Sequence, residues 1–260
     1  MQALSVAFAV LGVPATARAN PHAQVSLLTD TDQPRAGSTF LIGIRIIPEP
    51  GWHGYWSNPG DSGIAPSVRW KAAPGLHFGP LLHPAPTLLK VSGVTSYVHP
   101  GEHFLLARVR ADAALERGTL LPIQAQLFWA TCSASLCVPE RTTLSLKLTV
   151  GDGNANASAR GLRLAAQRLP RQLTPGVFRS RGGLVWMEVP RAAQVDPSRA
   201  MFFPMLNGIL TAPTIRIHKK AGKTGNTEIV ARLFGEAPSR ISGTLSDGKS
   251  SYVLSFRKAK

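Results

Sequence analysis

Two cysteines, Cys132 and Cys137, are the residues of this 260-residue chain whose type and spacing best suit chemistry. Apolar and polar residues alternate over 123–129 and again over 144–150, which predicts a strand on each side of the pair. In an antiparallel hairpin closed by residues 133–136, the two cysteines would face each other. Opposed Cα atoms lie about 4.5 to 5.5 Å apart in such a ladder, a separation that a disulfide can bridge. We therefore expect a local disulfide at a strand end.

This bridge is better suited to exchange than to stapling the fold. A loop this short contributes only about 2 kcal/mol in the chain-entropy model, against about 4 or more for a long loop. The residues between the cysteines are mostly small, so the sulfurs should be reachable, and Pro139 stiffens the exit. Two thiols without a nearby histidine are too few for a structural zinc site. A purely structural bridge stays open as the alternative.

Three strings carry a resemblance to a known family. They are Cys132-x4-Cys137 followed by Val-Pro-Glu, the string Gly-Trp-His-Gly-Tyr-Trp-Ser-Asn-Pro-Gly-Asp-Ser-Gly at 51–63, and Val-Arg-Trp at 68–70. Together they resemble the N-terminal periplasmic domain of the DsbD thiol:disulfide interchange family, and more closely its ScsB-type branch, which is linked to copper tolerance. The resemblance covers residues 22–150 well and residues 160–260 more loosely.

The resemblance implies a fold, an activity and partners. The domain would be an immunoglobulin-like sandwich with protein-disulfide reductase activity and no cofactor. It would take electrons from a membrane-linked thioredoxin-like reductase and pass them to oxidised periplasmic proteins. Cys132 and Cys137 would be the catalytic redox pair, with Cys137 forming the mixed disulfides. The resemblance and the sequence neighbourhood of the pair place Tyr55, Trp56, Pro139 and Glu140 near it, and a cap loop within 87–94 would shield it through Leu88, Leu89 and Val91.

The N-terminus is typical of a secretory signal peptide over residues 1–19. An apolar run at 3–13 is followed by Pro14 and by Ala17-Arg18-Ala19, which is a small-x-small cleavage pattern. A buried first strand or helix is the alternative. Export would place the mature chain in the periplasm, where a disulfide can persist. No later stretch reaches the roughly 18 apolar residues of a membrane span, so we expect a soluble mature chain.

Composition and patterning predict an all-β fold of two immunoglobulin-like sandwich domains. The chain has 24 glycines and 21 prolines that separate short alternating segments. The expected domains are residues 20–150, which carry the cysteines, and a small basic β domain at 171–260. A linker and short helix at 151–170 would join them, with Ser158 as N-cap and Pro170 as the stop. Further strands are expected at 40–47, 107–110, 184–189, 214–218, 228–233, 241–245 and 252–256.

Charge is concentrated in the second half. Residues 20–150 have a net charge of +2 and residues 151–260 a net charge of +12, within a total of +15. Such a field attracts anionic surfaces, and we expect an anionic membrane face or a membrane reductase to be the partner. Ordinary solvated surface charge is the alternative. Nucleic acid is not expected for an exported chain without a basic and aromatic binding platform.

Other candidate sites are weaker. Ser62 lies in a Gly-Asp-Ser-Gly string like that of a serine protease nucleophile, but Asp61 and Ser62 are better interpreted as turn residues. His99 and His103 flank a Pro-Gly turn, and we interpret them as exposed loop histidines rather than metal ligands. Two further classes remain open, a non-enzymatic binding module and a copper-handling protein that uses both thiols.

Overall fold

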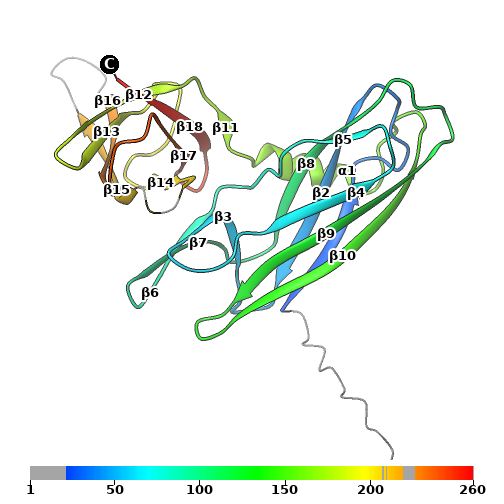
Figure 1. The fold of residues 1–260 in the computed structure, drawn as a ribbon, viewed down its shortest axis with the longest axis horizontal. Helices are drawn as coiled ribbons and strands as arrows, with labels where there is room; N and C mark the ends of the chain where they lie inside the picture. The colour runs from blue at the N-terminus through cyan, green and yellow to red at the C-terminus, as the bar shows by residue number, and fades with distance from the viewer. Residues whose placement is uncertain (1–21, 207, 209, 219–225, 260) are drawn as a thin grey trace, which may run out of the picture.

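The computed structural model describes residues 22–206, 208, 210–218 and 226–259 (Figure 1). These residues form strands β1 to β18 and the short helix α1, so the all-β prediction is confirmed. The expected signal peptide lies outside the described residues. None of the helical structure in the described part is long and apolar enough to cross a bilayer.

The first core lies in an N-terminal sandwich, which we define as residues 22–150. Two sheets enclose it, in the strand orders β1-β2-β8-β5 and β10-β9-β4, and a third sheet has the order β3-β7-β6. Along β2 the apolar side chains of Phe40, Ile42, Ile44 and Ile46 alternate into the core, as the sequence pattern predicts. The strands are β1 (Ala23–Thr29), β2 (Thr39–Pro48), β3 (Gly54–Gly60), β4 (Ser67–Ala72), β5 (Leu76–Phe78), β6 (Thr87–Val91), β7 (Val94–His99), β8 (His103–Ala111), β9 (Leu120–Cys132) and β10 (Cys137–Thr149).

Helix α1 (Ala159–Gln167) packs on this sandwich. Ser158 is its N-cap residue, as expected, although its side chain makes no capping hydrogen bond. Leu162 is fully buried, and the helix contacts β1, β2 and β8. A Cβ atom at Gly43 would lie 2.5 Å from the Leu162 side chain, so the glycine in this strand allows the helix to approach.

A second core lies in the C-terminal unit, which we define as residues 171–259. Its strands belong to one hydrogen-bonded sheet in the order β14-β17-β18-β12-β13-β16-β15, with β11 paired to β18. The strands expected near residues 184–189, 214–218, 228–233, 241–245 and 252–256 are all present. The bounds are β11 (Arg171–Gln172), β12 (Gly176–Arg181), β13 (Leu184–Glu188), β14 (Met201–Pro204), β15 (Leu210–His218), β16 (Asn226–Leu233), β17 (Arg240–Ser246) and β18 (Ser251–Lys258).

The two parts meet at the sheet formed by β3, β7 and β6, which lies between them in Figure 1. Trp56 of β3, Tyr97 of β7 and Phe203 of β14 form one buried aromatic cluster. The side chain of Asn58 donates a hydrogen bond to the carbonyl oxygen of Pro204 across the junction, at 2.7 Å. The junction therefore combines apolar packing with a buried hydrogen bond.

The exposed-loop interpretation of His99 and His103 is wrong. Both side chains are buried, because they lie on the ends of β7 and β8 rather than in the turn between them. Their rings are stacked with centroids 4.5 Å apart. His83, from the loop before β6, lies close enough to influence the charge of both. Burial lowers the pKa of His83 and of His103 to about 4 and that of His99 well below its ordinary value.

Candidate functional site

Strands β9 and β10 form the predicted hairpin and bring the cysteines together. In the antiparallel register Cys137 pairs directly with Cys132, and no irregularity interrupts the ladder. The two residues form a disulfide with their Cα atoms 4.1 Å apart. The connecting loop is closed by a hydrogen bond from the Ser133 amide to the Leu136 carbonyl oxygen, at 2.8 Å.

The two cysteines differ in accessibility. Cys132 is 1% exposed and packs with Tyr55, Val98 and Ala130, whereas Cys137 is exposed. The sequence argument from small loop residues predicted two reachable sulfurs. The structure shows one buried cysteine and one exposed cysteine, because the residue at the end of β9 faces the third sheet. An incoming thiol therefore meets Cys137 first.

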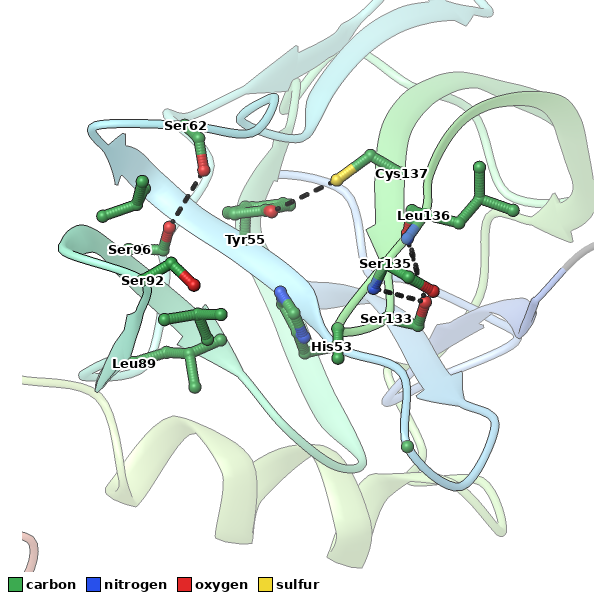
Figure 2. Close-up of a pocket in the computed structure, with 14 residues that line it drawn as sticks. His53, Tyr55, Ser62, Leu89, Ser92, Ser96, Ser133, Ser135, Leu136 and Cys137 are labelled. Carbon is green, nitrogen blue, oxygen red and sulfur yellow. Dashed lines mark hydrogen bonds between the residues drawn. The ribbon is translucent and has the colours of Figure 1, made fainter.

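Cys137 lines a pocket of about 640 Å³. One wall is the loop of residues 133–136, and the opposite wall comes from the β6–β7 hairpin, which we define as residues 87–99. Figure 2 shows Tyr55 and His53 between these two walls. The disulfide thus lies in a depression with a mixed polar and apolar lining.

Tyr55 is a pocket residue whose side chain makes a polar contact with a sulfur of the pair. Its hydroxyl oxygen lies 3.7 Å from Sγ of Cys137 (Figure 2). Burial raises the pKa of this phenol, and a hydrogen bond with Ser62 opposes the shift, so the hydroxyl keeps its proton at neutral pH. Gly63 has a φ of +101°, and a Cβ atom there would lie 2.2 Å from the Tyr55 ring. A glycine at this position therefore leaves room for the tyrosine.

His53 is a pocket residue that the sequence reasoning missed. Its amide donates to the carbonyl oxygen of Cys132 at 2.8 Å, and the Cys132 amide donates back to His53 at 3.0 Å. Its ring lies edge-on to that of Tyr55 with centroids 5.4 Å apart. Burial lowers the pKa of His53, so the imidazole is neutral at pH 7. Its position two residues before Tyr55 on the same strand face, in the string at 51–63, is the signal that could have identified it.

The β6–β7 hairpin has two different faces. Cross-strand pairs put Leu89 opposite Ser96 and Val91 opposite Val94, and all four residues line the disulfide pocket. Leu88 pairs with Tyr97 on the alternate face and packs on the aromatic cluster at the junction. Of the three residues expected in the cap, Leu89 and Val91 lie by the disulfide and Leu88 points away from it.

The other residues expected near the pair lie in different environments. Trp56 follows Tyr55 along β3 and therefore points to the opposite side, where it contacts Phe203. Pro139 is exposed on β10, an edge strand that tolerates a missing amide donor. Glu140 is three residues from Cys137, so the ladder directs its side chain to the opposite face. It is buried there, and its carboxylate oxygens have no hydrogen-bond partner among the described residues.

The turn after β3 is hydrogen-bonded to strand β7. The Asp61 carboxylate accepts a hydrogen bond from the Thr95 amide at 2.9 Å, and the Ser62 hydroxyl lies 3.2 Å from that of Ser96. Neither contact joins the Ser62 hydroxyl to a histidine or carboxylate that could act as its general base. Within the described ranges, no group of three or more histidine, cysteine or acidic residues has the arrangement of a metal site.

Comparisons with known proteins agree with this geometry. Residues 24–149 match the family model described as "Thiol:disulfide interchange protein DsbD, N-terminal". The N-terminal periplasmic domain of ScsB from Proteus mirabilis has the same fold over 96% of this chain and 97% of that chain, with a TM-score of 0.66 and 18% identity. No curated protein matches the chain.

Two solved structures from Neisseria meningitidis are also similar. The DsbD N-terminal domain in its reduced form is 15% identical, with a TM-score of 0.26 over 51% of this chain and 87% of that chain. A chain from the complex between the DsbD N-terminal and the PilB N-terminal domains is 14% identical, with a TM-score of 0.29 over 57% of this chain and 94% of that chain. Residues 24–149, which include both cysteines, therefore match the DsbD N-terminal family, and the chain as a whole shares the fold of the ScsB domain.

Proposed function

We propose that this protein relays electrons by thiol:disulfide exchange at Cys132 and Cys137. It receives them from a membrane-linked thioredoxin-like reductase and passes them to oxidised periplasmic proteins. The observation that carries the proposal is the unequal exposure of the two bonded cysteines, with Cys137 in the pocket and Cys132 buried behind it. One accessible and one protected sulfur are what sequential attack and resolution require.

Reduction begins when a thiolate of the reductase attacks Sγ of Cys137. The disulfide breaks, a mixed disulfide forms with Cys137, and Cys132 leaves as a thiolate that takes up a proton. The second thiol of the reductase then attacks the reductase sulfur of the mixed disulfide, and Cys137 leaves as a thiolate that takes up a proton. The reductase leaves oxidised, and the protein keeps two electrons and two protons as a pair of thiols.

Delivery runs in the opposite direction. The Cys137 thiolate attacks a disulfide of the acceptor, and one acceptor sulfur leaves as a thiolate. Cys132 then attacks Sγ of Cys137, which releases the second acceptor thiol and restores the bridge. The protonated Tyr55 hydroxyl is placed to donate a hydrogen bond to the Cys137 thiolate and so to stabilise it. The neutral His53 in the same pocket is available to accept a proton.

The surroundings of the pocket suit a protein partner. Val91 and Val94 on the hairpin and Leu136 on the cysteine loop are large apolar residues that are 41–54% exposed. Apolar side chains around a polar reactive centre are typical of the centre of a protein interface. The basic C-terminal unit would keep the protein near the anionic membrane face, where the reductase resides. Export to the periplasm fits a disulfide that is cycled rather than permanently reduced.

Exchange with a thioredoxin-like protein tests the proposal. Oxidised protein is mixed with excess reduced thioredoxin, quenched with acid, alkylated and analysed by intact mass. We expect both cysteines of the folded protein to become alkylated within minutes, because Cys137 is accessible. A pair that stays oxidised for hours in the folded chain, yet is reduced at once in denaturant, would contradict the proposal and indicate a structural bridge.

A further inference from the structure

The sheet formed by β3, β7 and β6 separates the disulfide from the C-terminal unit. On one face, Tyr55 and Val98 pack with Cys132, and Leu89 packs against them. On the other face, Trp56 and Tyr97 pack with Phe203, and Leu88 packs against them. The two clusters share the same strands, because successive side chains of a strand point to opposite faces. The two clusters therefore lie back to back on opposite faces of this sheet.

Phe203 is the residue of the C-terminal unit that packs in the cluster with Trp56 and Tyr97. It lies on β14, an edge strand of the sheet, where Phe202 points into the C-terminal core and Phe203 points out of it. The Phe203 ring meets that of Tyr97 edge to face, with centroids 5.3 Å apart and planes at 88°. It meets the Trp56 ring at 6.3 Å and 65°. Phe203 is only 3% exposed, so the hairpin and β3 cover it.

A buried hydrogen bond fixes the same junction. Asn58 is 3% exposed, and its amide nitrogen donates to the Pro204 carbonyl oxygen while its side-chain oxygen accepts from the Gly60 amide at 3.0 Å. Both groups of the Asn58 side chain are thus satisfied when β14 packs against the end of β3. Within residues 22–150, the β6–β7 hairpin pairs with β3 and is hydrogen-bonded to Asp61 in the turn after β3.

We propose that the C-terminal unit is seated against the back of the β6–β7 hairpin and thereby controls access to the disulfide. Phe203 is a positioning residue, acting through Tyr97 and Leu88 on Leu89 and Val91 at the pocket. Displacement of the C-terminal unit would release the hairpin and expose Cys137 further to a partner. The inference builds on the proposed exchange function, since it names an element that regulates the same pair.

The test is the rate at which a small reductant reduces the oxidised protein. In Phe203→Ala we expect reduction by dithiothreitol to be several-fold faster than in the parent, because the hairpin loses its support. Hydrogen exchange of the amides in residues 87–99 should accelerate as well. Phe203→Leu, which keeps more of the packing volume, should give a smaller change. Phe234→Ala removes an exposed aromatic ring of the same unit outside the junction and should react like the parent.

Two results would overturn the inference. One is a Phe203→Ala protein that reacts and exchanges at the parental rates. The other is an equal acceleration in Phe234→Ala, which would indicate general loosening of the C-terminal unit. Reduction by dithiothreitol reports only the accessibility of the disulfide. If reduced thioredoxin fails to react with the parent and with every variant, the proposed function is refuted, but the inference that the C-terminal unit controls access is not.

Discussion

Cys137→Ser abolishes electron transfer to and from the protein. The exposed sulfur is the atom that a partner reaches first, and Cys132 is too buried to replace it. A serine hydroxyl is almost entirely protonated at neutral pH, whereas a thiol with a pKa of about 8.5 supplies some thiolate. We therefore expect the rate of exchange with a thioredoxin-like protein to fall by about a thousandfold or more. The measurement mixes the reduced variant with an oxidised thioredoxin-like protein, quenches with acid and counts alkylated thiols, with far-UV circular dichroism to establish that the variant is folded.

Cys132→Ser is the matched variant and should behave differently. The Cys137 thiolate can still attack an acceptor disulfide, but no second thiol resolves the product. A mixed disulfide should therefore accumulate, visible as a covalent adduct that disappears on addition of dithiothreitol. Complete turnover by either single variant, or an adduct formed by Cys137→Ser but not by Cys132→Ser, would contradict the assigned roles.

Acidification from pH 7 to 5.5 should destabilise the fold by about 3 to 4 kcal/mol through His83, His99 and His103. Burial lowers the pKa of all three in the folded state, whereas an unfolded histidine has a pKa of about 6.5. At a pH below the unfolded pKa and above the folded pKa, these histidines are protonated in the unfolded chain and neutral in the folded chain. The stabilisation is complete above pH 6.5 and is lost as the pH falls, by about 1.4 kcal/mol per pH unit for each histidine.

Urea unfolding at several pH values measures this dependence. The window above pH 5.5 avoids the range in which most carboxylates titrate. His99→Leu should remove roughly a third of the pH-dependent loss, whatever its effect on the stability at pH 7. A free energy of unfolding that stays constant from pH 7 to 5.5 would show that the cluster does not act in this way.

The hairpin that holds the cysteines could be predicted from the sequence in detail. Period-two patterning on both sides and a four-residue loop determine the register, so the pairing of Cys132 with Cys137 followed from local information. Helix α1 and most of the longer strands were predictable for the same reason, because periodicity over many residues is a local signal. The family resemblance added the region around Tyr55.

Properties that depend on which face a short strand buries could not be predicted. Leu88 and Leu89 are adjacent and chemically identical, yet one lies at the junction and the other at the pocket. Tyr55 and Trp56 are also adjacent, yet Tyr55 lies at the pocket and Trp56 at the junction. The burial of His99 and His103 depends on the packing of two strand ends, and a Pro-Gly turn between them suggested exposure instead. These assignments need the tertiary arrangement of the third sheet, which no local pattern contains.

The reduction potential of the Cys132–Cys137 couple tests the central claim most directly. The folded protein is equilibrated in glutathione or dithiothreitol buffers of defined ratio, and alkylated thiols are counted by intact mass. An exchange pair in a relay should have a potential between roughly −120 and −270 mV, the range of dedicated thiol:disulfide exchange proteins. A potential well below about −300 mV would identify a structural disulfide and contradict the proposed function.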